Sequence, residues 1–174
     1  MCALCDELGG LGDGVGLSDR PPHRLAGFVW EGSHVEAAKG AIHPLFGRVR
    51  AFADGRGSGL WRSPVVGLSL AEGDGGFRYL VAVAVEPDET VPAGMTVMDI
   101  PEMTFASIWH LPEDGAVAAH YERMAGMVRE AGLTWDRSHL HRREEYPPDF
   151  DPSQPPSLRL MLPVARDGDP EVGR

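Results

Sequence analysis

The sequence predicts an α+β protein made of two similar units, each with the element order strand, helix, strand, strand. Apolar residues recur at helical spacing in two segments, 43–54 and 115–132. The other apolar segments are short and rich in β-branched and aromatic residues, as strands are. Two such units side by side form an antiparallel sheet with two main helices on one face. This arrangement leaves the other face free for a ligand groove between the repeats.

The first unit covers residues 23–90 and begins with an extended segment, "HRLAGFVWEG". The small and polar residues 31–41 indicate a loop or a short helical turn. The helix 43–54 has Pro44 at its first position, which proline favours, and one apolar stripe along its length. Two strands, "PVVGLSLAE" and "FRYLVAVAVE", are joined by the turn "GDGG" and complete the unit.

The second unit covers residues 91–165 in the same order. Its first extended segment, "MTVMDIPEMTFASIWH", is interrupted at Pro101. Asp114 is a suitable N-cap for the helix 115–132, and Gly132 is suited to the position just past the helix. The stripe of this helix that we expect to be buried consists of Val117, Tyr121, Met124 and Val128. The strands "LHRREEY" and "LRLMLPVA" follow.

The two ends of the chain differ in composition from the single domain, residues 23–165, that we expect between them. Residues 1–22 contain many glycines and few large apolar side chains, which predicts a flexible N-terminal arm. Residues 166–174 predict a flexible tail for the same reason. The lone CxxC formed by Cys2 and Cys5 lacks the further ligands of a four-ligand zinc site, and it indicates two thiols on a frayed terminus.

The formal net charge of -10 argues against some classes of partner. An acidic surface repels phosphate backbones, so we expect no direct binding of nucleic acid. No apolar run is long enough to span a bilayer, and "MCALCDELGG" lacks the basic region of a signal peptide. These features predict a cytoplasmic protein without membrane attachment, and they leave its oligomeric state open.

Four segments, spread over about residues 60–165, follow one another in an order and spacing that match a known protein family. They are the hairpin "VVGLSL…FRYLVAVAVE", the segment "VPAGMTVMDIPEMTFASIWH", the helix "YERMAGMVREAGLTW" and the ending "REEYPPDFDP…LRLMLPV". Together they resemble the GyrI-like small-molecule-binding domain. This domain is also the effector domain of multidrug-responsive transcription regulators.

The resemblance implies a duplicated fold whose ligands, typically flat, apolar and often cationic, bind in the groove between the repeats. It implies that a glutamate, here Glu144, and the tyrosine two residues later, here Tyr146, face this groove. The 22 residues before the domain are too few for a helix-turn-helix domain, so the resemblance is to the stand-alone members. A family glycine that follows the histidine of the second segment comes later here, in "WHLPEDG", so we expect a different groove rim.

The strand pattern alone offers a second interpretation of Glu144. Charged residues on strands are mostly exposed, so this carboxylate could form an ion pair with Arg142 or Arg143 in solvent. The resemblance favours the groove for Glu144. It does not do so for Glu145, because successive side chains of a strand point to opposite faces.

Aromatic residues are the other binding candidates, because aromatic walls suit flat and cationic molecules. Tyr79 and Trp109 lie on segments that the resemblance places at the groove. Phe77 shares a strand face with Tyr79, and Trp61 could close the mouth of the groove. The alternative is that such rings fill the core.

Three functions remain open. The first is binding of a flat hydrophobic drug or natural product, either neutral or cationic, for resistance or sequestration. The second, which the resemblance implies for some stand-alone members, is hydrolysis of the strained cyclopropane of a DNA-alkylating natural product. Glu144 would then activate water, and Tyr79 and Tyr146 would hydrogen-bond the substrate carbonyl. The third is a protein-interaction or inhibitor module.

No metal and no cofactor are predicted. The sequence contains no HExxH, no P-loop and no GxGxxG after a strand. His139 and His141 share a strand face, and His110 and His120 lie elsewhere, with no recognisable ligand spacing.

Overall fold

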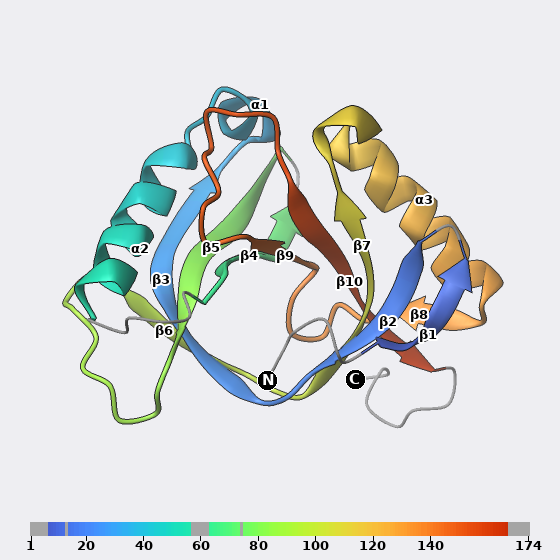
Figure 1. Ribbon diagram of the computed structural model, residues 1–174, viewed down its shortest axis with the longest axis horizontal. Helices are drawn as coiled ribbons and strands as arrows, with labels where there is room; N and C mark the ends of the chain where they lie inside the picture. The colour runs from blue at the N-terminus through green and yellow to red at the C-terminus, as the bar shows by residue number, and fades with distance from the viewer. Residues whose placement is uncertain (1–6, 13, 57–62, 74, 167–174) are drawn as a thin grey trace.

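The computed structural model describes residues 7–12, 14–56, 63–73 and 75–166, which form one mainly antiparallel sheet and its helices (Figure 1). The strands are β1 Glu7–Gly12, β2 Val15–Arg20, β3 His23–Gly32, β4 Val65–Gly73, β5 Gly76–Val85, β6 Thr96–Ile100, β7 Met103–His110, β8 Leu133–Trp135, β9 Arg142–Tyr146 and β10 Leu158–Arg166. The helices are α1 His34–Ala38, α2 His43–Gly55, the 3-10 turn η1 Pro112–Asp114 and α3 Val117–Glu130. The strand order is β1-β2-β7-β10-β9-β4-β5-β3-β6, and β8 pairs with β10. The predicted α+β fold with duplicated units is therefore confirmed.

The first unit consists of β3, α1, α2, β4 and β5, and β5 pairs antiparallel with both β3 and β4. Ser33 and Glu36 form a capping box that starts α1, and Pro44 occupies the first turn of α2. Helix α2 buries Phe46 and Val49 against the sheet. Such a side chain contributes about 1.5–3 kcal/mol when it is fully removed from water, so this contact holds α2 in place.

The second unit repeats the plan with β6, β7, α3, β9 and β10. Helix α3 buries Tyr121, Met124 and Val128 of the predicted stripe, whereas Val117 is only partly buried. Gly132 follows its C-cap with φ 72°, a value that glycine adopts without strain. The prediction that Asp114 is the N-cap is wrong, because Ala116 occupies that position without a side-chain cap. Asp114 instead accepts a hydrogen bond from the Leu111 N–H at 2.8 Å and closes the η1 turn.

Two very short links force the sheet to curl. Strands β2 and β3 lie near opposite ends of the sheet, yet only Pro21 and Pro22 separate them in the chain. Strands β6 and β7 are likewise joined by Pro101 and Glu102 alone. Three consecutive Cα–Cα steps reach at most about 11 Å, so the two ends of the sheet must meet. Figure 1 shows both links crossing at the bottom of the view.

The predicted flexible arm is wrong for the part that the structure describes. Residues Val15–Arg20 form β2, which pairs with β7 from Gly16 to Arg20 and buries the Ser18 side chain completely. The partner strand is almost ninety residues away in sequence, and local composition carries no sign of it. Residues 1–6, with Cys2 and Cys5, and residues 167–174 lie outside the described part of the chain.

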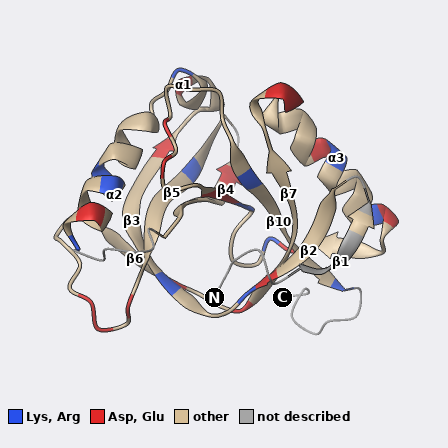
Figure 2. Cartoon of the chain, viewed as in Figure 1, with Lys and Arg blue, Asp and Glu red and all other residues tan. Residues whose placement is uncertain are grey.

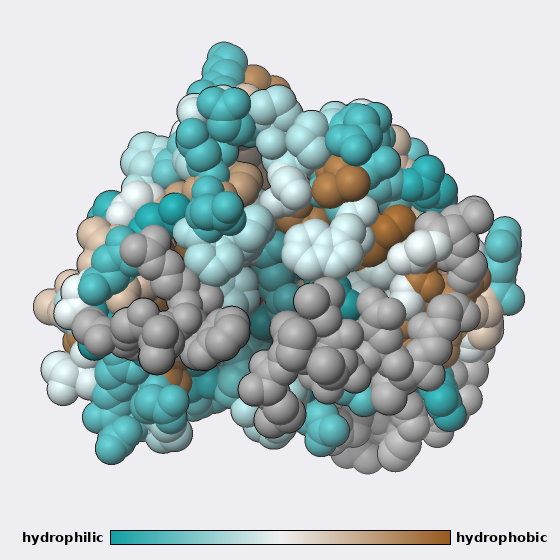
Figure 3. Space-filling model, viewed as in Figure 1, coloured by the Kyte–Doolittle hydropathy of each residue, from teal (hydrophilic) through white to brown (hydrophobic). Residues whose placement is uncertain are grey.

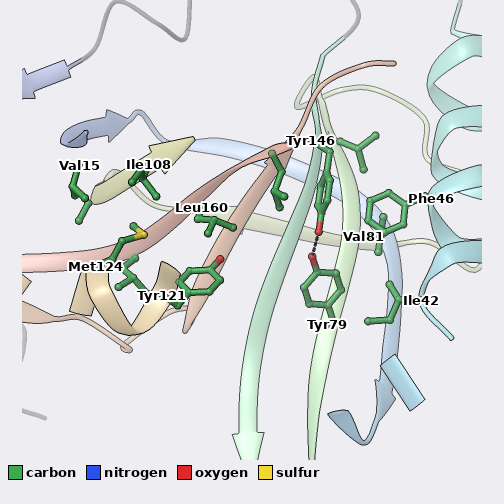
Figure 4. Packing of buried hydrophobic residues seen from close by; sticks show 14 of the residues in the cluster. Val15, Ile42, Phe46, Tyr79, Val81, Ile108, Tyr121, Met124, Tyr146 and Leu160 are labelled. Carbon is green, nitrogen blue, oxygen red and sulfur yellow. Dashed lines mark hydrogen bonds between the residues drawn. The ribbon is translucent and has the colours of Figure 1, made fainter. Parts of the chain in front are cut away.

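Apolar side chains pack on both faces of the curled sheet. The cluster under α2 and α3 includes Phe46, Val49, Met124, Val128 and Leu160 (Figure 4). The cluster on the inner face, which no helix of the described chain covers, includes Leu25, Leu68, Phe105, Leu140 and Met161. Charged residues lie along both helices (Figure 2), and hydrophilic residues dominate the face seen in Figure 3. No helix in the described ranges combines the length and the apolar character that crossing a membrane requires.

Candidate ligand-binding site

A cavity of about 490 Å³ lies between the two units. Its walls come from α1, α2, β4, β5, α3, β9 and the segment that follows β9. The lining residues are His34, Ala37, Ala38, Ile42, His43, Phe46, Ser69, Glu72, Phe77, Tyr79, Val117, Ala118, Tyr121, Arg142, Glu144, Tyr146, Phe150, Pro152, Gln154, Pro156 and Leu158. The expectation that the groove occupies the sheet face without helices is wrong. The curl encloses that face, and the cavity opens on the helix side.

Glu144 is the polar centre of this cavity. Tyr79 Oη donates a hydrogen bond to Oε2 at 2.5 Å, and Tyr146 Oη donates to the same oxygen at 2.6 Å. Tyr121 Oη donates to Oε1 at 3.2 Å. The chain has three tyrosines, and all three hydroxyls therefore surround one carboxylate. Figure 4 shows the hydroxyls of Tyr79 and Tyr146 pointing toward each other, 3.1 Å apart.

Strand register brings these groups together. Glu144 and Tyr146 are two residues apart on β9 and so share a face. Glu144 pairs with Gly67 of β4, whose other neighbour, β5, carries Tyr79. A Cβ atom on Gly67 would lie 1.8 Å from Tyr79 Oη, so glycine is required for the phenol to reach across β4 to Glu144.

The three phenols are hydrogen-bond donors at neutral pH. Burial raises the pKa of Tyr79, Tyr121 and Tyr146 well above the usual value, and the negative charge of Glu144 raises it further. Glu144 itself is only half-buried and faces the cavity. The site therefore presents a carboxylate, held by neutral donors, to whatever enters.

Aromatic rings form much of the apolar wall. Tyr146 packs edge-on against Phe46, with ring centroids 4.8 Å apart, and lies 4.5 Å from the ring of Phe150. On the opposite strand Phe77 stacks on His34, with centroids 4.6 Å apart and planes 18° apart. The carboxylate thus lies among rings that can contact the faces of a flat molecule.

Four of the predicted residues, Glu144, Tyr79, Tyr146 and Phe77, lie together at the cavity. Trp109 does not line it. Its side chain is 44% exposed and alternates on β7 with Ile108, which packs under the helices, so it points to the other face. Trp61 lies outside the described residues.

The structure also decides between the two interpretations of Glu144. Arg142 forms its ion pair with Glu72 at 3.4 Å, and Arg143 with Glu145 at 2.9 Å. Neither ion pair involves Glu144. Its carboxylate instead accepts hydrogen bonds from the phenols and faces the cavity.

Tyr121 is the site residue that sequence analysis missed. The helical pattern predicts Tyr121 only as a member of the buried stripe, and the side chain does lie there. The available signal was its hydroxyl, since a tyrosine in a buried stripe needs a hydrogen-bond partner.

Comparison with known proteins identifies the family. The model of the GyrI-like small molecule binding domain matches residues 17–165. The chain belongs to the GyrI-like family. The match begins inside β2, in agreement with the place of this strand in the sheet. No curated protein matches the sequence.

Solved structures share the GyrI-like fold at low sequence identity. The C-terminal domain of EcmrR is 15% identical, with a TM-score of 0.61, and the match covers 87% of this chain and 97% of that one. SAV2435, solved bound to tetraphenylphosphonium, is 18% identical, with a TM-score of 0.57 and coverages of 87% and 93%. A hydrolase from Listeria innocua is 16% identical, with a TM-score of 0.50 and coverages of 86% and 91%.

Proposed function

We propose that this GyrI-like protein binds a flat, hydrophobic, cationic small molecule in the cavity between its repeats, for resistance or sequestration. The observation that carries the proposal is the Glu144 carboxylate, which three buried phenols hold inside an apolar, aromatic-walled cavity. A half-buried negative charge is costly to desolvate further without a positive partner. A cation that enters supplies that partner.

The size and the walls of the cavity support this ligand class. About 490 Å³ falls within the range of about 300–1,000 Å³ that is usual for pockets of drug-sized molecules. Aromatic faces attract cations and stack on flat rings. Arg142 and Glu72 at the wall pair with each other, so Glu144 is the charge left to attract a ligand cation. The tetraphenylphosphonium bound to SAV2435 is a hydrophobic aromatic cation, although it is tetrahedral and not flat.

The same groups support hydrolysis as a second candidate function. A carboxylate beside phenol donors can take a proton from water while the phenols stabilise negative charge on a substrate carbonyl. In this case Glu144 would be the base, and Tyr79 and Tyr146 the donors, in the opening of a strained cyclopropane. The Listeria innocua structure of the same fold is described as a hydrolase.

One experiment separates binding from hydrolysis. We would titrate the protein with tetraphenylphosphonium and with planar aromatic cations, follow tryptophan fluorescence, and compare Glu144→Gln with the surface control Glu102→Gln. Two unit charges 4 Å apart interact by about 4 kcal/mol at an effective dielectric constant of 20. We therefore expect Glu144→Gln to weaken binding of the cations about tenfold or more, and Glu102→Gln to leave it unchanged.

Hydrolysis is tested in the same samples by mass spectrometry with cyclopropane-bearing alkylators. Addition of water that Glu144→Gln abolishes, while binding persists, supports the hydrolase. Cation binding that Glu144→Gln does not change refutes the carboxylate as anchor. If no compound binds, a protein-interaction module becomes the favoured function.

A further inference from the structure

A second cluster of polar side chains lies where β7 passes into α3. His110 is the last residue of β7, Asp114 ends the η1 turn, and His120 lies in the first turns of α3. The side chain of His110 is fully buried and that of His120 is 4% exposed, whereas Asp114 is exposed. One possible ligand atom from each residue lies within 4.8 Å of the other two. The cluster plays no part in the cavity chemistry described above.

The two imidazoles face each other through the same nitrogen. The Nδ1 atoms of His110 and His120 are 2.9 Å apart, and the ring planes meet at 83°. If both rings are neutral, a hydrogen bond between these atoms uses the lone pair of only one of them. Two buried imidazoles with a single shared hydrogen bond are a costly way to fill this space.

A metal ion would bind the Nδ1 lone pairs of both rings at the same time. We propose that His110, His120 and Asp114 bind a divalent transition-metal ion of the zinc type, with water in the remaining position. Neutral imidazole nitrogen and carboxylate oxygen are ligands that Zn²⁺ prefers, and three protein ligands plus water are a common set. At Zn–N distances near 2.0–2.1 Å, tetrahedral ligands lie about 3.3 Å apart. The two rings therefore need to separate by only a few tenths of an ångström.

Asp114 can complete the set by a small movement. Its Oδ2 atom accepts the Leu111 N–H, and the other carboxylate oxygen has no hydrogen bond in the described structure. The residue is exposed and stands on a single 3-10 turn, so its side chain can approach the histidines without disturbing the core. The carboxylate also supplies the negative charge that favours a cation.

The site would connect the outer end of β7 to the beginning of α3. The first turns of α3 carry Val117, Ala118 and Tyr121, which line the ligand cavity. A bound metal ion would hold this wall of the cavity in place. Sequence analysis predicted no metal site because the three residues follow no ligand spacing, and only the return of α3 onto β7 brings them together.

The test uses the 174-residue chain with Cys2→Ser and Cys5→Ser, so that the thiols of these two residues cannot bind the metal. Zn²⁺ is titrated by calorimetry, and Co²⁺ is followed by its visible absorption bands. We expect one equivalent to bind with a Kd in the micromolar range and to raise the Tm. Asp114→Asn and His120→Asn should each weaken binding about tenfold or more, and the exposed His139→Asn should not.

Folding of the variants is checked by circular dichroism without metal. Asp114→Asn changes an exposed residue and serves as the decisive variant if His120→Asn does not fold. The proposal is overturned if the cysteine-free chain binds no Zn²⁺ at a free concentration of about 100 μM. It is equally overturned if Asp114→Asn binds Zn²⁺ as tightly as the parent chain does.

Discussion

Glu145→Gln is expected to destabilise the fold strongly, because the Glu145 carboxylate forms ion pairs with two buried arginines, Arg20 and Arg143, on the inner face of the sheet. Its side chain is 8% exposed. Arg20 Nε and Nη2 donate to its two carboxylate oxygens at 2.9 Å, and Arg143 Nε donates to Oε1 at 2.9 Å. Arg20 comes from β2 and Glu145 from β9, so the contact spans the curl of the sheet.

The pKa of Glu145 gives the size of the effect. Burial alone would raise this pKa, but the hydrogen bonds and charges of Arg20 and Arg143 outweigh burial and hold it at about 2, against 4.5 for an unperturbed glutamate. The difference, at about 1.4 kcal/mol per pH unit, corresponds to about 3 kcal/mol. Loss of one partner of a buried ion pair costs about 3–5 kcal/mol, which agrees with this figure.

The sign of the pH dependence follows from the lowered pKa. The stabilisation is fully present above about pH 4.5, where the glutamate of the unfolded chain is ionised, and it is lost as the pH falls toward 2. Urea denaturation followed by tryptophan fluorescence at pH 7 should show a loss of about 3 kcal/mol in Glu145→Gln. Between pH 5 and pH 3 the variant should lose less stability than the parent protein does.

The exposed Glu130→Gln is the control and should change neither value by more than about 0.5 kcal/mol. A Glu145→Gln protein within about 1 kcal/mol of the parent at pH 7 would refute the reasoning. It would show that the fold tolerates the two buried arginines without the Glu145 carboxylate.

Two further predictions concern the cavity. Gly67→Ala would place a Cβ atom 1.8 Å from Tyr79 Oη, so the phenol must leave Glu144, and we expect weaker cation binding in the fluorescence titration with the fold retained; unchanged binding would contradict the packing. The raised pKa of all three tyrosines predicts that phenolate absorbance stays absent in the folded protein above pH 10, where their contribution to stability begins to fall. Glu144→Gln should lower the pH at which phenolate appears, and an absorbance rise near pH 10 in the folded parent would argue against the buried cluster.

Much of the fold follows from local patterns. Strand β3 coincides with the predicted segment 23–32, and α2 extends only one residue past the predicted end of its segment. Alternation along β9 also predicts that Glu144 and Tyr146 share a face and that Glu145 points away. These features depend on neighbours in sequence, which is why a single sequence contains them.

The features that escaped prediction depend on partners far along the chain. Strand β2 forms because it pairs with β7. Trp109 points away from the cavity because its neighbour Ile108 takes the face of β7 that packs under the helices. The hydroxyl of Tyr121 reaches Glu144 because α3 packs against β7, β8 and β10. Residue types and spacings in the sequence do not predict these long-range contacts.

The crossing of two proline-containing links has a consequence for how a ligand enters. At the bottom of Figure 1, Pro21 and Pro22 join β2, which pairs with β7 of the second unit, to β3 of the first unit. Pro101 and Glu102 join β7 to β6, which pairs with β3 of the first unit. The repeats are also joined by the pairing of β4 with β9, so they cannot swing apart about a single hinge. Entry and exit must instead depend on local motion at the cavity mouth, where α1 and the segment 147–157 supply lining residues without being part of the sheet. Substitutions in that segment should alter rates of association and dissociation more than they alter the stability of the fold.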